Sequence, residues 1–518
     1  MSLRYLLGVD IGTFSSKGVL VGDDGEVAAE RTVEHSLDIP SPGWAEHDPE
    51  RVWWGDFLLI CRDLLQTSGV KPASIEALGV STISPAVVAV DAEGRALRPA
   101  ILYGIDTRAT AEIAELSRET GTHHDSQSAA PKVMWIRRHE PQVWSRARWI
   151  LNGSGYLNLR LTGARTIDVY DASIFAPLFD ARARAWSNDF DSLVAPVQMM
   201  PEITWTSAVM GRVTPEAARQ TGLAAGTPVI TGTADAAAEA VGAGLAAPGD
   251  MMVMYGSSTF FILRTDRLRS PPGFWSSRFL EPETFVVAGG TATAGSLTRW
   301  FRDQFAPEER SAERAGGENA YAALARMADA SPPGSRGLVV LPYFCGERTP
   351  LDDPAARGMI FGLTLGHTRS DVYRAVLESV GFSIRHNIEA LKAQGCAASR
   401  ILAVGGGTRN AVWMKIVSDI AGIEQVVPAR QVGASYGDAF LAGIGAGFFR
   451  DMGEARLWVR PGATIRPDPR TRTVYEAPFR LYRELYEKTR DEMKKSAEIE
   501  RLGGGDSDPG RNEALGSR

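Results

Sequence analysis

A short polar stretch near the start of the chain carries residue types suited to phosphate chemistry. Residues 10–17 read DIGTFSSK and lie between apolar runs at 6–9 and 18–21 that predict two strands. The tight turn between them would present backbone N–H groups and hydroxyls to an anion, and Lys17 would add a positive charge. Asp10 would repel a phosphate unless a cation lies between them, as Mg²⁺ held through a carboxylate and water would. The alternative is an ordinary polar hairpin without a ligand.

Length and composition narrow the class of protein. The chain of 518 residues is longer than one hydrophobic core normally supports, so we expect at least two domains. Its 44% apolar and 23% charged residues are typical of a soluble globular protein, and a net charge of −6 argues against nucleic-acid or membrane partners. Three scattered cysteines, with no CxxC pair and no opening signal peptide, favour a reduced, cytoplasmic location.

Two further glycine-rich turns follow predicted strands. Residues 249–266 read GDMMVMYGSSTFFILRTD, again strand, small-donor turn and strand, which indicates either an internal duplication or a coincidence. Residues 399–422 read SRILAVGGGTRNAVWMKIVSDIAG, in which glycines join a strand to a helix and would let a flat ligand approach the backbone. The chain contains neither GxxxxGK[ST] nor GxGxxG, which argues against a P-loop NTPase and a Rossmann dehydrogenase.

A lone carboxylate among small residues is the candidate base. Asp235 lies in TGTADAAAEAVGAG, at a predicted helix start. It either compensates the helix dipole or serves as a general base beside space left for a substrate.

Several ordered segments together resemble the FGGY family of carbohydrate kinases, the group that contains the xylulokinases and glycerol kinases. The resemblance extends from residue 6 to about residue 449. Besides the opening hairpin, it rests on GWAEHDPERVWW at 43–54, the segment 346–385 that begins GERTPLDDPAARG, GGGTRN at 405–410 and GASYGDAFLAG at 433–443.

The resemblance implies an α/β fold of two actin-like (ribonuclease H-like) domains, with mixed sheets around a central cleft. It also implies ATP and Mg²⁺ as cofactors. The implied roles are Mg²⁺ binding for Asp10, contact with the transferred phosphoryl group for Thr13 and Lys17, contact with the nucleotide phosphates for Ser257 and Gly295, adenosine binding for Gly406, Gly407 and Asn410, and general-base catalysis for Asp235.

The sugar side departs from the family pattern. Ser84 and Pro85 stand where xylulokinases commonly carry Met-His, and YGIDTR at 103–108 replaces Trp-Asn-Asp-x-Arg. Ser84, Asp106 and Arg108 remain candidate substrate contacts, although Asp106 and Arg108 could equally form a surface salt bridge. The implied activity is phosphorylation of a sugar or polyol, with a ketopentose such as D-xylulose as the leading acceptor. Another ketose or polyol, an actin- or Hsp70-like ATPase, and an inactive sugar sensor are the alternatives.

The organisation expected along the chain has four parts. Residues 1–245 form the sugar and phosphate domain, 246–450 the nucleotide domain, 451–500 a closing helical segment, and 501–518 a mobile tail. A helix after residue 368 should bury a stripe from Val372 to Ile388, with a capping box at its start. Glu347 and Arg348 are either an ion pair or neighbours of the cleft. Sugar or polyol and ATP are the expected small-molecule partners, and a homodimer is the expected assembly.

Overall fold

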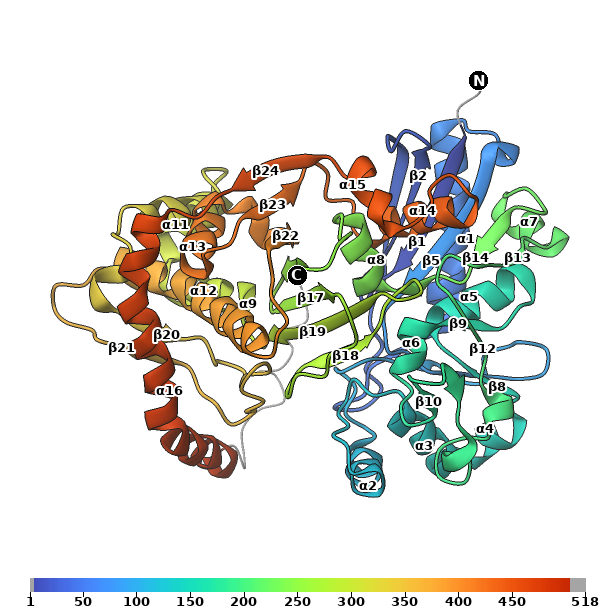
Figure 1. The fold of residues 1–518 in the computed structure, drawn as a ribbon, viewed down its shortest axis with the longest axis horizontal. Coiled ribbons are helices and arrows are strands. Elements are labelled where there is room, and N and C mark those ends of the chain that lie inside the picture. The colour runs from blue at the N-terminus through green and yellow to red at the C-terminus, as the bar shows by residue number, and fades with distance from the viewer. Residues whose placement is uncertain (1–3, 504–518) are drawn as a thin grey trace.

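The computed structural model describes residues 4–503 and has two α/β lobes, each built on a seven-stranded mixed sheet (Figure 1). The expected tail at 501–518 lies outside the described residues, apart from its first three, which end the last helix. None of the helices between residues 4 and 503 is long and apolar enough to cross a membrane.

The first sheet has the strand order β13-β14-β5-β1-β2-β3, with β15 beside β5. Strand β1 pairs antiparallel with β2 and parallel with β5. The bounds are β1 Tyr5–Ile11, β2 Ser15–Gly22, β3 Val27–Glu34, β5 Ile75–Thr82, β13 Val209–Arg212, β14 Pro228–Ile230 and β15 Thr233–Ala234.

The second sheet repeats the arrangement of the first. Its order is β18-β19-β17-β16-β22-β23-β24, and β16 pairs antiparallel with β17 and parallel with β22, as β1 does with β2 and β5. This match of order and direction favours duplication over coincidence for the two hairpins. The bounds are β16 Asp250–Tyr255, β17 Thr259–Thr265, β18 Trp275–Arg278, β19 Phe285–Thr291, β22 Arg400–Val404, β23 Gln425–Pro428 and β24 Pro461–Ile465.

Helices cover both faces of the first sheet. Alternate residues of β1 face opposite sides, so Leu7 and Val9 pack with α1 (Gly55–Ser68), while Leu6 packs with α14 (Ala434–Gly445). Helix α8 (Asp235–Gly242) lies against α14. Figure 1 shows α14, late in the chain, beside the blue strands of the first sheet.

A smaller subdomain extends the first lobe around its own hydrophobic core. Its elements, with the short strands nearby, are β4 Glu46–His47, β6 Val88–Val90, β7 Ala100–Ile101, α2 Thr110–Thr120, α3 Ala130–His139, α4 Pro141–Arg146, β8 Trp149–Leu151, β9 Thr166–Asp168, α6 Val169–Ser173, β10 Phe179–Asp180, β11 Ala185–Trp186 and β12 Glu202–Thr204. Helices α5 Gly153–Thr162 and α7 Pro215–Thr221 belong instead to the main core of the first lobe.

Long helices complete the second lobe. The predicted capping box of α12 is present, and its stripe is core, with Val376 and Val380 fully buried and Val372 half-buried. The predicted closing helix lies within α16, but the segment 451–500 also contains β24, which pairs antiparallel with β23. The remaining bounds are α9 Gly295–Phe305, α10 Pro307–Arg314, α11 Ala320–Asp329, β20 Val339–Leu341, β21 Met359–Phe361, α12 Arg369–Ala393, α13 Ala411–Ala421, α15 Ala455–Trp458 and α16 Pro469–Gly503.

The two lobes share a hydrophobic core. Leu6 and Ala77 of the first sheet belong to the same buried cluster as Met252 and Leu402 of the second, together with α8 and α14. The division at residue 245 stays a prediction, because α14 comes after it in the chain yet packs on the first sheet.

Candidate functional site

The opening hairpin is tighter than its sequence suggests. Strands β1 and β2 extend to Ile11 and back from Ser15, so Asp10 and Lys17 lie opposite each other within the strands and not in the turn. The expectation that residues 10–17 form the turn was therefore wrong. The first turn, as residues 12–15 are called below, closes through a hydrogen bond from Gly12 N to Ser15 O (3.0 Å).

Three carboxylates gather on the face of the first sheet that carries α8 and α14. Burial, with the charge of Glu239 nearby, raises the pKa of Asp10 to about 7. Asp235 is the first residue of α8, and burial together with the Asp10 charge raises its pKa well above the ordinary value. Glu239 follows one helical turn later, and burial raises its pKa to about 7, opposed by Lys17.

A fourth carboxylate reaches this group from the far end of the sequence. Asp438 of α14 accepts a hydrogen bond from Ser81 Oγ (2.7 Å), and the same hydroxyl lies 3.0 Å from Asp10 Oδ1. Burial, with the Asp10 charge, raises the pKa of Asp438 well above its ordinary value. Its other oxygen, Oδ1, is buried without a hydrogen-bond partner among the described residues.

Tyr103 connects the first turn to Asp235. The Tyr103 hydroxyl lies 3.0 Å from Thr13 Oγ1, and burial together with the nearby Asp235 charge raises the pKa of Tyr103. The sequence reasoning passed over this residue. Its signal was an aromatic residue directly after the apolar run 100–102, which leads out of a buried strand.

Ser84 borders the same group of carboxylates. Its hydroxyl donates to Asp171 Oδ1 (2.6 Å), and Asn152 Nδ2 donates to the other oxygen (2.6 Å). Burial raises the pKa of Asp171 to about 6, and the Asp171 charge in turn contributes to the raised pKa of Asp235. Ser84 is therefore bonded to a carboxylate whose charge acts on the candidate base.

Asp106 and Arg108 form a buried ion-pair network, not a surface salt bridge. The guanidinium of Arg108 pairs with Asp106 (2.7 Å) and Glu46 (2.7 Å), and its side chain is 0% exposed. Asp106 also accepts a hydrogen bond from Ala45 N (2.7 Å), while Trp44 stacks 4.0 Å from the Arg108 guanidinium carbon. In the present arrangement, both side chains hold the loop that carries Tyr103.

The second hairpin meets the start of a helix. Its turn closes through Gly256 N to Ser258 O (3.0 Å), and Gly295 N at the beginning of α9 donates to Gly256 O (2.9 Å). A Cβ on Gly295 would lie 2.5 Å from that carbonyl oxygen, so only glycine allows the contact. Ser257 and Gly295 are therefore neighbours, as their predicted common role requires.

The glycine cluster after β22 lies beside the end of β16, because these two strands are parallel neighbours. Gly405 and Gly407 pack against Tyr255, whereas Gly406 has open space where a side chain would be. Asn410 caps α13 by accepting from Trp413 N (3.0 Å). The five predicted nucleotide residues thus gather at one end of the second sheet.

Glu347 and Arg348 brace the second hairpin instead of pairing with each other. Glu347 Oε1 accepts from Ala292 N (2.8 Å), and Arg348 Nη2 donates to the carbonyl oxygens of Thr259 (3.1 Å) and Thr291 (2.7 Å). These contacts hold the ends of β17 and β19.

The donor set at Asp10 fits a magnesium ion that is shared with a substrate. No group of three His, Cys, Asp or Glu side chains in residues 4–503 is arranged to hold a metal alone. Mg²⁺ is usually held by one or two carboxylates together with water and substrate phosphates. The clustered carboxylates around Asp10 have Lys17 as their cationic neighbour, so they favour an added cation.

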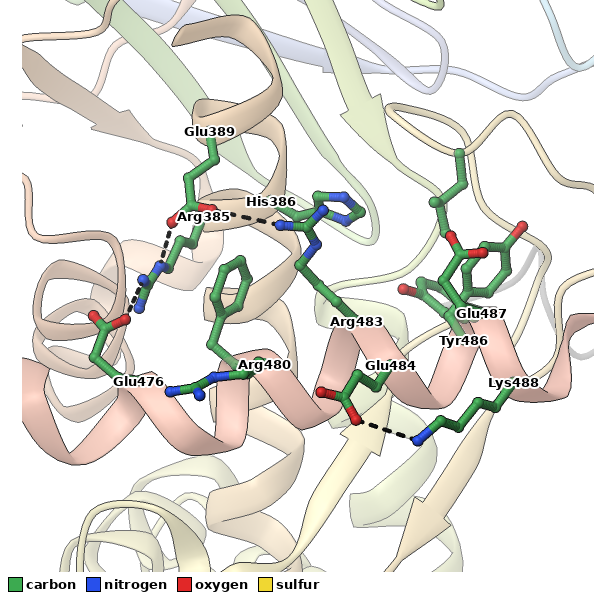
Figure 2. Close-up of a pocket in the computed structure, with 13 residues that line it drawn as sticks. Arg385, His386, Glu389, Glu476, Arg480, Arg483, Glu484, Tyr486, Glu487 and Lys488 are labelled. Carbon is green, nitrogen blue, oxygen red and sulfur yellow. Dashed lines mark hydrogen bonds and ion pairs between the residues drawn. The ribbon is translucent and has the colours of Figure 1, made fainter. Parts of the chain in front are cut away.

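A cavity of about 500 Å³ between α12 and α16 lies away from these residues. Figure 2 shows its charged side chains largely paired with one another, for example Arg385 with Glu389 (2.8 Å) and Glu476 (2.8 Å). Because four acidic side chains balance four basic ones in this lining, the cavity has no charge preference that would select a phosphate.

Comparisons with known proteins agree with this geometry. The model of the N-terminal domain of the FGGY family of carbohydrate kinases matches residues 5–242, and that of the C-terminal domain matches residues 251–446. A xylulose kinase of Escherichia coli (strain K12) is 30% identical, covering 93% of this chain and 98% of that protein. A glycerol kinase of Pseudomonas aeruginosa is also 30% identical, covering 87% of this chain and 92% of that protein.

A solved structure shares the fold. The crystal structure of xylulose kinase from Rhodospirillum rubrum is 34% identical, with a TM-score of 0.87, and the match covers 95% of this chain and 100% of that chain. The predicted two-domain actin-like fold and the resemblance drawn from the motifs are confirmed. The chain therefore belongs to the FGGY family of carbohydrate kinases and is an ATP-dependent sugar kinase.

Proposed function

We propose that this kinase transfers the γ-phosphoryl group of ATP to a hydroxyl of a ketopentose, with D-xylulose as the leading acceptor. The proposal is supported by the names of its relatives, several of which are xylulose kinases. The second candidate is a polyol, which the glycerol kinase relative favours.

The observation that carries the chemistry is the half-buried Asp235, whose pKa is raised by desolvation and by the nearby Asp10 charge. In the proposed reaction, Asp235 accepts the proton of the sugar hydroxyl while the hydroxyl oxygen bonds to the γ-phosphorus. The bond from that phosphorus to ADP breaks at the same time, and ADP leaves with the electron pair. Burial raises the pKa of Asp235, which makes the carboxylate a stronger base than an exposed aspartate.

Charge on the transferred group is countered from the first hairpin. Lys17 and the hydroxyl of Thr13 would contact the transferred phosphoryl oxygens. Asp10 would hold Mg²⁺, directly or through water, and this ion would neutralise phosphate charge when ATP is bound.

The nucleotide would lie against the second sheet. Ser257 and Gly295 would contact its phosphates through the hairpin turn and the start of α9, where backbone N–H groups favour an anion. Gly406, Gly407 and Asn410 would hold the adenosine, and the open space at Gly406 supports this placement.

The sugar would lie between Asp235 and the loop 103–108. Ser84 is the proposed direct contact, since its partner Asp171 adjoins Asp235. Asp106 and Arg108 belong to the sugar side in this proposal, and their buried pairs keep Tyr103 over the first turn.

The test is a panel of pentuloses, hexuloses, glycerol and erythritol, assayed for ADP release with ATP and Mg²⁺. We expect the highest kcat/KM with a ketopentose. If a hexulose or a polyol gives a higher kcat/KM, that compound and not a ketopentose is the acceptor. ADP release that does not depend on any acceptor would favour an actin- or Hsp70-like ATPase. Binding of a sugar without turnover would favour an inactive sugar sensor.

We further propose a cytoplasmic location and a homodimer. Light scattering after size-exclusion chromatography tests whether the protein is a homodimer.

A further inference from the structure

The first turn has every carbonyl oxygen occupied from within the protein. Two of the four donors are histidine side chains from outside the hairpin. The acceptor and donor pairs are Gly12 O with His35 Nε2 (3.2 Å), Thr13 O with His47 Nε2 (3.1 Å), Phe14 O with His35 N (3.0 Å) and Ser15 O with Gly12 N (3.0 Å).

His47 is fixed as a donor to the turn by its own surroundings. The indole N–H of Trp53 donates to His47 Nδ1 (3.2 Å), so the imidazole proton must lie on Nε2, where it points at Thr13 O. The side chain is fully buried, and burial with the nearby His35 lowers the pKa of His47 to about 4. The ring is therefore neutral at physiological pH and has one donor.

His35 is held differently, because its Nδ1 faces a carboxylate, which only accepts hydrogen bonds. Nδ1 therefore donates to Asp56, and the bond from Nε2 to Gly12 O uses the second N–H of the imidazolium. Its Nδ1 lies 2.8 Å from Asp56 Oδ2, and Ser16 Oγ donates to the same carboxylate oxygen (2.6 Å). The His35 and His47 rings meet edge to face with centroids 4.9 Å apart. Trp53 and Asp56 thus support two rings that contact the same turn.

The hydrogen bonds from His35 to Gly12 O and from His47 to Thr13 O set the peptide planes of the turn. In a planar trans peptide, the C=O and the following N–H point in opposite directions. With Gly12 O and Thr13 O held by the histidines, the N–H groups of Thr13 and Phe14 point away from them. Neither N–H has a hydrogen-bond partner within residues 4–503, and the Phe14 side chain is 54% exposed.

We propose that His35 and His47 are positioning residues that hold the first turn with the N–H groups of Thr13 and Phe14 directed at the phosphoryl group of ATP. This inference rests on the proposed function of the turn. A flipped peptide would direct a carbonyl oxygen at the phosphate and replace attraction with repulsion. Preorganised N–H donors aimed at developing negative charge are a principal source of transition-state stabilisation.

The test compares His47→Phe, which removes the donor but keeps a flat ring, with His47→Gln, whose amide can still donate to Thr13 O. We expect kcat/KM for ATP to fall about 10- to 100-fold in His47→Phe and to stay within about fivefold of wild type in His47→Gln. The KM for the best sugar of the panel should not change in either variant. Rates are expressed per folded molecule, with the folded fraction measured by circular dichroism.

His386→Phe is the matched control, because this half-buried histidine lies at the α12–α16 cavity away from the site (Figure 2). It should retain wild-type kinetics. If His47→Phe does not fold, Trp53→Phe tests the proposal in its place. This variant loses the indole N–H that keeps the His47 proton on Nε2, so kcat/KM for ATP should fall about three- to tenfold.

Two outcomes overturn the proposal. One is near-normal kcat/KM for ATP in folded His47→Phe, or in Trp53→Phe if that variant decides. The other is an equal loss in the Gln and Phe variants, which would mean that packing and not the hydrogen bond matters. A wild-type enzyme that turns over no acceptor would instead contradict the proposed function and would be seen before any variant is made.

Discussion

At the scale of single residues, the site brings carboxylates together where their charges oppose one another. Asp10 and Glu239 each have a pKa raised to about 7, and the charges of both contribute to the raised pKa of Asp235. Such crowding costs stability in the unliganded protein and is useful only if a cation and a proton donor enter the site. This arrangement argues against a purely structural role for Asp235 at the start of α8.

Asp235→Asn tests the base. The amide keeps the size of the side chain but cannot accept the hydroxyl proton, so kcat should fall about 10²- to 10⁴-fold. The KM for ATP should change little, because the proposed adenosine residues lie on the other lobe. Steady-state ADP release with the best acceptor measures both constants.

Glu216→Gln is the matched control, since Glu216 is an exposed acidic residue near the N-terminus of α7. It should cost a little stability and leave kcat unchanged. Turnover near wild type in Asp235→Asn would reduce Asp235 to the same helix-start role.

At the scale of elements, close contacts between glycines and backbone bring α14 onto the first sheet. Gly79 of β5 lies so near this helix that a Cβ would be 2.6 Å from Asp438 O, and a Cβ on Gly8 of β1 would overlap Ser435 O. The close approach is what delivers Asp438 to Ser81 and the site. Helix α14 thus serves as a wall of the site and as a link between the lobes.

Gly8→Ala should therefore be severely destabilising. The added methyl group meets backbone atoms that cannot rotate away, so we expect a loss of about 3 kcal/mol or more in the free energy of unfolding. Urea titration checks this value. Gly406→Ala, where no atom lies within 4 Å, should change that free energy by less than about 0.5 kcal/mol. Equal stability of the two variants would contradict the observed packing of α14.

The bracing of the second hairpin should depend on pH. Burial raises the pKa of Glu347 to about 7 from its usual 4.5, so the folded state binds this proton more tightly than the unfolded chain. The stability that comes from this tighter proton binding is fully present below about pH 4.5 and is lost as the pH rises to about 7. Glu347→Gln keeps acceptors and donors for Ala292 N and Ser383 Oγ without this titration.

The Tm difference between Glu347→Gln and wild type should accordingly become more favourable to the variant from pH 5 to pH 8, by a few degrees. Differential scanning calorimetry measures both proteins, and Glu283→Gln, at a side chain that is 85% exposed, should show no such trend. A difference that moves the other way would mean that Glu347 is stabilised as an anion.

At the scale of the whole molecule, the residues proposed for the transferred phosphoryl group lie on the first sheet and those proposed for adenosine on the second, and the two sheets share a core. Tyr170 of the first lobe packs against Phe279 of the second, with ring centroids 5.6 Å apart, and this contact lies close to the carboxylates around Asp235. Ligands that contact both lobes would favour their approach, because each adds contacts only when the lobes are together.

Small-angle scattering should show this closure. The radius of gyration should decrease when a non-hydrolysable ATP analogue and the sugar are both bound, and less with either alone. The affinity for each ligand should rise in the presence of the other by the same factor. An unchanged radius with both ligands bound would exclude closure as the origin of such coupling.

Local patterns in the sequence were sufficient for much of this description. Both hairpins, the strand before the triple glycine, the capped helix α12 with its buried stripe, and Asp235 at a helix start follow from short-range spacing. Even there, the sheet extended the first hairpin beyond the local signal, because β5 pairs alongside β1 as far as Ile11 and draws Asp10 into the strand.

Tertiary structure alone decided which distant residues meet. Asp438, Tyr103 and His47 join the site through contacts with Ser81, Thr13 and the first turn that span up to 357 residues of sequence. Nothing in the local periodicity of α14 shows that this helix packs on the first sheet and not on the second. The physical reason is that hydrophobic spacing specifies which face of an element is buried. The order of strands in a sheet specifies which other element covers that face.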